Sequence, residues 1–263
     1  MRNGLVDFSR DELGVATLEL RNPPANAYSY EMMRDLDEAI LEARMDEACQ
    51  VIVLTGAGDK FFCAGADIAM LANVMPRYKY NFCLHANETL LRLENTPKLV
   101  IAAILGHCVG GGLEIALAAD IRVAARGTGK TGLPEVNLGV LPGTGGTQRL
   151  ARLVGRSKAI ELMGEGRLVD YDEAQRLGLV NHVYEVEGFR SRVADYARSF
   201  CAPHRASLSV GFIKRAVHSG LDGSLAEGLS LERELQQRLF ESSDASEGIA
   251  AYVEKRKPVF RGR

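Results

Sequence analysis

The sequence predicts an α/β fold in a chain of 263 residues. Short apolar runs typical of buried strands alternate with longer stretches that have helical periodicity. Hydrophobic residues make up 46% of the chain, which is enough for a substantial buried core. The strand signals fade from about Arg192 onward, so we expect a helical region after the mixed core.

The N-terminal part begins with a strand, a helix and a second strand. Apolar side chains alternate along Val15–Leu20, which predicts a half-buried strand. Asn22–Pro24 predicts a turn, and Tyr30–Met45 has the periodicity of a helix. Val51–Gly56 is apolar without alternation, which is typical of a strand buried on both faces.

The long apolar segment Leu99–Ala119 is interpreted as a strand, a loop and a helix. Its length and apolar character would also suit a membrane span, but His107, Glu114 and a cluster of glycines argue against that alternative. We expect a buried strand at Leu99–Ile104 that stops at Gly106, and a helix from Leu113 onward.

The remaining elements complete the alternating pattern and then become helical. Ile121–Ala125 predicts another strand, which leads into the Pro134 and Gly145–Leu153 regions. In the tail, Leu208–Val217 and Leu225–Phe240 have helical periodicity with many charged residues. No low-complexity linker separates the tail from the core, so we expect it to pack on the core or on a neighbouring subunit.

Composition points to small-molecule chemistry in a reducing compartment. The 32 basic and 34 acidic residues leave no charge bias toward nucleic acid or a membrane surface. The five cysteines are scattered, with no C-x-x-C pair, and the histidines show no metal-ligand spacing. The N-terminus resembles neither a secretion signal nor a transit peptide, which favours the cytoplasm, although a processed mitochondrial matrix protein would look the same.

Two acidic residues near glycine-rich segments are the candidates for proton transfer. Gly110–Gly112 opens a predicted helix that carries Glu114, and glycines there expose backbone N–H groups at the positive end of the helix. Glu135 follows Pro134 in a separate element. Taken alone, the glycines could simply allow tight packing, Glu114 could pair with an arginine, and Glu135 could be a solvent-facing helix start.

Three motifs in order resemble the enoyl-CoA hydratase/isomerase (crotonase) superfamily, and the resemblance extends from Asn22–Ala27 to Tyr252–Lys257. The motifs are Phe62–Ile68, Gly106–Glu114 and Leu133–Leu150. The resemblance implies a spiral of repeated strand-strand-helix units over residues 1–191 and a helical trimerisation region over 192–263. It also implies an acyl-CoA thioester substrate, no cofactor or metal beyond the coenzyme A of that substrate, and homotrimers that commonly pair into hexamers.

The resemblance also implies roles for individual residues of the reaction site. The backbone N–H groups of Ala66 and Gly111 match an oxyanion hole, which would stabilise an enolate-like charge on the thioester oxygen. Glu114 would activate or hold a water molecule, Glu135 would exchange the proton at the α carbon, and the backbone of Gly143 would contact the water. Adjacent carboxylates titrate as a coupled pair, so the division of acid and base roles stays open.

For coenzyme A, the resemblance implies a contact from the Ala64 carbonyl to adenine and one from Lys255 to phosphate, often across a subunit boundary. Lys255 could equally belong to a solvated basic tail. The chain departs from the family at Ala69-Met70, where many hydratases have a lysine or glutamine. It departs again at Leu133, an apolar residue that leaves the acyl-chain preference open.

Two other patterns are interpreted as structural. Gly127–Thr131 resembles a phosphate-binding loop but lacks its first glycine, so we expect an exposed turn. His107 and Cys108 are adjacent in a predicted strand and would face opposite sides, so we expect packing and not a Cys/His nucleophile.

The leading hypothesis is therefore a hydratase that adds water reversibly to an enoyl-CoA, or dehydrates the 3-hydroxyacyl-CoA. The two glutamates favour it over a double-bond isomerase of the same superfamily, which usually needs one proton shuttle. A trimer that binds RNA or protein without catalysis is the alternative of another class, and the absence of a lysine-rich helix weighs against RNA.

Overall fold

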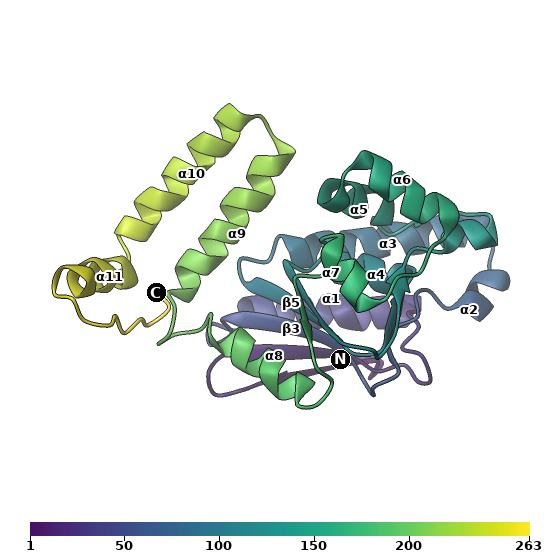
Figure 1. Cartoon of the computed structure of the whole chain (residues 1–263), viewed down its shortest axis with the longest axis horizontal. Helices are drawn as coiled ribbons and strands as arrows, with labels where there is room; N and C mark the ends of the chain where they lie inside the picture. The colour runs from purple at the N-terminus through teal and green to yellow at the C-terminus, as the bar shows by residue number, and fades with distance from the viewer.

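The computed structural model describes all residues, 1–263, and is built around a six-stranded sheet. Figure 1 labels two of its strands, β3 and β5. The strand order is β1-β2-β3-β5-β7-β9, with β1 antiparallel to β2 and every other neighbouring pair parallel. Its strands are β1 (Val6–Arg10), β2 (Val15–Leu20), β3 (Val51–Gly56), β5 (Leu99–Ile104), β7 (Ile121–Ala125) and β9 (His182–Tyr184). The strands predicted at β2, β3, β5 and β7 are confirmed, with the same bounds.

A second, three-stranded sheet lies beyond the ends of the first. Its order is β4-β6-β8, all parallel, with bounds Phe61–Cys63, His107–Val109 and Thr131–Gly132. Each of these short strands follows a strand of the large sheet, so that β3 leads to β4, β5 to β6 and β7 to β8. The prediction of repeated strand-strand-helix units is thereby confirmed. Two of the short strands, β4 and β8, gave too brief an apolar signal to be predicted individually.

Helices cover both faces of the large sheet and divide its side chains between two apolar clusters. α1 (Tyr30–Met45) and α3 (Pro76–Glu94) pack on one face, where Leu18, Leu54 and Ala102 are fully buried. α8 (Phe189–Arg198) packs on the other face, against the opposite side chains of β3 and β5. This double coverage explains the continuous apolar runs of β3 and β5, which have no exposed residue.

The short helices gather at the end of the molecule where the small sheet lies. They are α2 (Ile68–Ala72), α4 (Gly111–Leu117), the 3-10 helix η1 (Glu135–Leu138), α5 (Gly146–Val154), α6 (Arg156–Glu165) and α7 (Tyr171–Arg176). The segment Leu99–Ala119 forms β5, β6 and α4, which confirms the predicted strand and helix. The expected loop contains the short strand β6, and the helix begins at Gly111, two residues earlier than predicted. No helix of the chain is long and apolar enough to cross a membrane.

The C-terminal helices extend away from the sheet (Figure 1). α9 (Ser207–Asp222) and α10 (Leu225–Phe240) form a hairpin, and α11 (Ser243–Val253) follows at its end. Both predicted tail helices are confirmed, and α9 is longer than expected at its C-terminal end. The ammonium of Lys214 fastens α9 to the core, because it lies 2.9 Å from the Oδ2 atom of Asp120.

Candidate active site

The three consecutive glycines before Glu114 each occupy a place where a side chain does not fit. Gly110 has φ +57°, which favours glycine, and turns the chain from β6 into α4. A Cβ atom on Gly111 would lie 2.4 Å from the ring of Tyr28, and one on Gly112 would lie 2.1 Å from the carbonyl oxygen of Cys63. The glycines therefore allow tight packing, which was the alternative that the sequence left open. This packing places the start of α4 against β4 and Tyr28.

Glu114 lies in the first turn of α4 and is only 2% exposed. Its Oε1 atom accepts the backbone N–H groups of Thr144 at 2.8 Å and of Gly146 at 2.7 Å, and its Oε2 atom accepts the Thr144 hydroxyl. Burial raises the pKa of Glu114, and these three donors partly offset the increase because they stabilise the charged form. The carboxylate is therefore fixed in one orientation.

Glu135, the first residue of η1, approaches the same helix start from another direction. Its Oε1 atom is 3.0 Å from where a Cβ of Gly110 would be, and its buried Oε2 atom has no hydrogen-bond partner. Burial, and then the charge of Glu114, raise the pKa of Glu135 to about 7. At neutral pH this carboxyl group can both hold and release a proton, as a general acid-base group requires.

The structure brings Ala66 and Gly111 together. A Cβ on Gly65, whose φ is +94°, would lie 3.1 Å from the backbone nitrogen of Gly111. Ala66 pairs with Tyr28 in an isolated parallel bridge, and its own N–H donates no hydrogen bond within the chain. Gly111 is the first residue of α4, where an N–H has no partner inside the helix. Two neighbouring N–H groups are thus free to bind an oxygen atom of a ligand.

Gly143 directly precedes Thr144 in the loop that holds Glu114. Its carbonyl oxygen accepts the side-chain amide of Asn87 at 3.1 Å, which ties this loop to α3. A Cβ on Gly143 would lie 3.2 Å from the sulfur of Cys83 on the same helix. The loop is therefore fixed by α3 on one side and by Glu114 on the other.

The two residues expected to contact coenzyme A lie far apart in the chain's fold. Ala64 follows β4, two residues before Ala66, and its N–H donates to the carbonyl of Ala25 at 3.0 Å. Lys255 is exposed and follows α11, which lies at the opposite end of the molecule from α2 and α4 (Figure 1). Within one chain, Lys255 does not come near the two glutamates.

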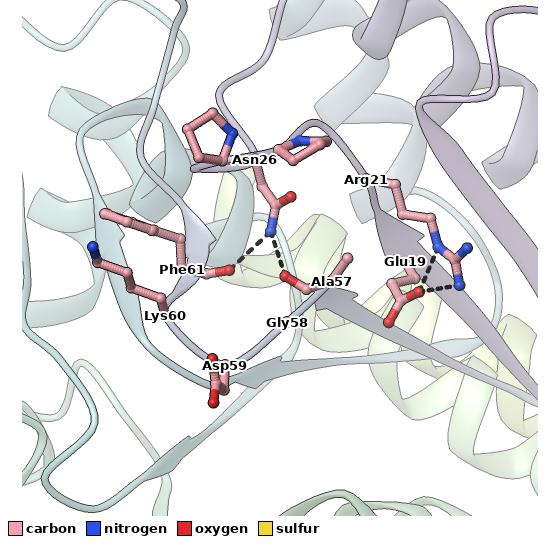
Figure 2. A pocket seen from close by; sticks show the side chains of 10 residues that line it. Glu19, Arg21, Asn26, Ala57, Gly58, Asp59, Lys60 and Phe61 are labelled. Atoms are coloured by element: carbon pink, nitrogen blue, oxygen red, sulfur yellow. Dashed lines mark hydrogen bonds and ion pairs between the residues drawn. The ribbon is translucent and has the colours of Figure 1, made fainter.

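A polar pocket of about 590 Å³ adjoins the segment that leads to Ala64. Figure 2 shows the Asn26 amide donating to the carbonyl oxygens of Ala57 and Phe61, which supports the loop between β3 and β4. Arg21 is paired with Glu19 and Asp7, whereas Lys60 is exposed and forms no ion pair. The pocket residues are Glu19, Arg21, Pro23, Pro24, Asn26, Ala57, Gly58, Asp59, Lys60 and Phe61.

The structure adds residues to which sequence reasoning assigned no role. Thr144 and Gly146 bind Glu114, and Tyr28 contacts both Gly111 and Thr144. Thr144 and Gly146 fall within the recognised motif Leu133–Leu150, but their hydrogen bonds depend on the path of a loop. Nothing in the sequence around Tyr28 distinguishes it from an ordinary core aromatic.

The structure agrees with the packing expected for His107 and Cys108 and with the turn expected at Gly127–Thr131. Cys108 is fully buried, and the Nδ1 atom of His107 accepts the backbone N–H of Lys130 at 3.2 Å, so neither activates the other. Gly127–Thr131 forms a turn that enters β8, with Lys130 exposed.

Comparison with known proteins agrees with the resemblance. The sequence profile of the enoyl-CoA hydratase/isomerase family matches residues 10–263. The putative enoyl-CoA hydratase/isomerase YngF of Bacillus subtilis is 38% identical over 98% of both chains. The crotonyl-CoA hydratase of Syntrophomonas wolfei is 36% identical over 94% of both.

Solved structures share the whole fold. An enoyl-CoA hydratase from Geobacillus kaustophilus has a TM-score of 0.95 at 41% identity, covering 100% of this chain and 98% of that one. Pseudomonas aeruginosa DspI has a TM-score of 0.90 at 32% identity, covering 98% and 97%. The chain belongs to the enoyl-CoA hydratase/isomerase family and has its crotonase fold. It is an enzyme of the hydro-lyase class, the class that the names of these relatives describe.

Proposed function

We propose that this enzyme adds water reversibly across the 2,3 double bond of an enoyl-CoA thioester to give a 3-hydroxyacyl-CoA, and catalyses the reverse dehydration. The observation that carries the proposal is the different environment of two neighbouring carboxyl groups. Glu114 is fixed by three donors, whereas Glu135 has a pKa of about 7 and a buried oxygen with no partner. The fixed carboxylate of Glu114 suits the orientation of a water molecule, and the carboxyl group of Glu135 suits proton exchange at carbon.

In this mechanism, water adds to the β carbon while its proton passes to Glu114, and Glu135 delivers a proton to the α carbon. The negative charge that develops on the thioester oxygen is stabilised by the N–H groups of Ala66 and Gly111. Their closeness, and the absence of an internal acceptor for the Ala66 N–H, support this oxyanion hole. We assign the Gly143 backbone as a further contact to the water, since it precedes the loop residues that bind Glu114.

Coenzyme A enters the proposal as part of the substrate. The carbonyl of Ala64 is assigned to adenine, and the neighbouring polar pocket supports a position for the adenosine phosphates beside Lys60. Lys255 follows α11, at the opposite end of the molecule from α2, so it does not share this site within one subunit. We assign it to a phosphate bound by a neighbouring subunit. The reaction as written uses only acid-base groups of the protein and no additional cofactor.

We also propose that the chain forms homotrimers, alone or paired as hexamers, through its C-terminal helices. The support is the apolar surface that these helices leave uncovered in one chain: Ile213, Val217, Leu221, Leu225, Leu229, Phe240, Ile249, Tyr252 and Val253 are all exposed. A cytoplasmic location fits the five free cysteines.

The test is a panel of enoyl-CoA thioesters that differ in chain length, branching and distal carboxylation. Hydration is followed as loss of absorbance of the conjugated thioester, and the product is identified by its gain of one water. Glu114→Gln and Glu135→Gln should each lower turnover ~10²- to 10⁴-fold while substrate still binds. The exposed Glu12→Gln serves as the matched control.

Near-normal turnover by either glutamine variant would remove the role assigned to that residue. Double-bond migration in a 3-enoyl-CoA without any addition of water would identify an isomerase. Salt-dependent retention of RNA with no turnover of any thioester would indicate a binding protein instead.

A further inference from the structure

Tyr28 lies between the two segments that carry the proposed oxyanion donors. Its backbone N–H donates to the carbonyl of Gly65 at 2.9 Å, and its carbonyl accepts the N–H of Asp67 at 3.0 Å. These two bonds enclose Ala66 and fix the direction of its peptide. Tyr28 therefore supports one proposed donor through its backbone alone.

The side chain of Tyr28 reaches the other segment. Its ring is buried and stacks on Phe82, with ring centroids 5.4 Å apart. A Cβ atom on Gly111 would lie 2.5 Å from the Tyr28 hydroxyl oxygen, so the hydroxyl group is held directly against the start of α4. A tyrosine that merely filled space at this position would not need its polar atom there.

The hydroxyl group has one hydrogen-bond partner, the Oγ1 atom of Thr144, at 3.3 Å. A threonine hydroxyl has a single proton, and Thr144 donates it to the Oε2 atom of Glu114. Tyr28 must therefore be the donor in its bond with Thr144. The result is a directed chain of hydrogen bonds from Tyr28 through Thr144 to the carboxylate of Glu114.

We propose that Tyr28 is a positioning residue of the active site, which acts through Thr144 to hold the Glu114 carboxylate ionised and in one orientation. This inference rests on the proposed function, because the orientation matters only if Glu114 handles the reacting water. A hydroxyl that receives a hydrogen bond becomes a better donor, so the bond from Tyr28 strengthens the one from Thr144 to Glu114. Phenylalanine would fill the same space and lack this donor.

The charges that surround Glu114 agree with this role. Glu135 faces it from η1, Arg149 approaches it from α5, and the Cys83 thiol lies on α3. Burial and the charge of Glu114 raise the pKa of Tyr28 well above its ordinary value, so its hydroxyl keeps its proton as a donor at any working pH. Loss of that donor should raise the pKa of Glu114 further, because the charged form loses support.

The experiment compares Tyr28→Phe, Thr144→Val and the double variant in the hydration of crotonyl-CoA. We expect Tyr28→Phe to lower kcat roughly 2- to 10-fold with little change in KM, which is the range of one neutral hydrogen bond. Because Tyr28 acts through Thr144, the double variant should be no slower than Thr144→Val alone. Tyr30→Phe is the matched control, since Tyr30 lies two residues away at the protein surface.

An unchanged kcat in Tyr28→Phe, or effects that multiply in the double variant, would overturn the inference. A second measurement does not depend on turnover: infrared titration of protein labelled with [δ-¹³C]glutamate, with the Glu114 band identified by its loss in Glu114→Gln. The Glu114 pKa should be higher in Tyr28→Phe than in the wild type, and equal values would also overturn the inference. If the wild-type protein hydrates no enoyl-CoA, the proposed function fails, and this titration still decides whether Tyr28 acts on Glu114.

Discussion

The backbone N–H of Gly146 donates to the Oε1 atom of Glu114 at 2.7 Å, and Gly146 leaves no room for a side chain beside that bond. A Cβ atom on Gly146 would lie 3.0 Å from Oε1 of Glu114, 2.9 Å from Cδ1 of Leu133 and 2.8 Å from Cβ of Pro142. The N-terminus of α5 is thus fitted directly to the carboxylate of α4. The position of Glu114 is determined by the backbone of a different element.

We predict that Gly146→Ala lowers kcat by roughly 10- to 100-fold, because the added methyl group must displace the Glu114 carboxylate or the loop that holds it. The backbone of Gly146 does not have a positive φ, so the effect should come from steric contact and not from conformational strain. Steady-state hydration and the melting temperature measure the change.

Gly164→Ala provides the control for that substitution. Gly164 lies in α6, and a Cβ there would meet no atom within 4 Å. Alanine should leave turnover unchanged and raise stability slightly, by about 0.5–1 kcal/mol. Wild-type kcat in Gly146→Ala would show that the loop adapts without moving Glu114.

The pH dependence should report the paired carboxyl groups. In the proposed cycle, one proton leaves Glu135 while another arrives on Glu114, so both directions require the pair to hold a single proton. The Glu135 pKa of about 7 predicts that kcat/KM falls as the pH rises through about 7, where that proton is lost, and falls again in acid, where a second proton binds.

The measurement is kcat/KM for crotonyl-CoA from pH 5 to 9 in buffers of constant ionic strength. Glu135→Gln cannot lose a proton at this position, so its low residual activity should lack the alkaline decrease. A wild-type profile that stays flat through pH 9, or an alkaline limb that persists unchanged in Glu135→Gln, would contradict the assignment.

The structure also shows why the sequence could predict the strands and single out the two acids as candidates, but could not predict the environment of those acids. Strands such as β3 and β5 are buried on both faces, so their apolar runs carry a strong local signal. Glu114 and Glu135 lie in recognisable motifs. The donors of Thr144 and Gly146 reach Glu114 across 30 and 32 residues of sequence, and no local pattern determines such a contact.

The polar pocket that contains Lys60 was not predicted from the sequence either, because it also depends on contacts between distant segments. Its lining comes from the end of β2 with the loop after it, and from the loop between β3 and β4 with the start of β4. These segments become neighbours because β2 and β3 pair in parallel. Lys255 illustrates a different case, because the resemblance singles it out although it lies at the opposite end of the molecule from α2. Resemblance therefore names single residues, whereas the cavity around them depends on strand pairing that the sequence does not show.

A third prediction concerns Arg149 and Glu94, which form a two-bond ion pair at 2.7 and 2.6 Å, with both side chains largely buried. Arg149 also donates to the carbonyl of Thr144 at 3.0 Å, so it helps to hold the residue that binds Glu114. Arg149→Met should lower stability by up to ~3–5 kcal/mol, because Glu94 is left without its partner. It should also lower kcat, because the Thr144 loop loses a donor.

Arg149→Met combined with Glu94→Leu separates these two effects. The double variant removes both charges, so it should regain much of the melting temperature, yet kcat should stay low because the Thr144 carbonyl still lacks its donor. Arg152→Met is the control on the same helix, since the Arg152 side chain is exposed. Full recovery of kcat in the double variant would show that the pair contributes only to folding.

The last prediction concerns the exposed, unpaired Lys60 of the polar pocket. If the adenosine phosphates bind there, Lys60→Ala removes one partly screened charge interaction, which should raise KM for crotonyl-CoA by roughly 2- to 10-fold at low salt and leave kcat nearly unchanged. The difference from wild type should shrink as ionic strength rises. Lys158→Ala is the matched control, because the Lys158 side chain is 42% exposed and already paired with Glu161. Equal KM values for Lys60→Ala and the wild type at low salt would exclude Lys60 from the phosphate contact. The cationic contribution would then have to come from Lys255 of a neighbouring subunit, and Lys255→Ala measured in the same series tests that directly.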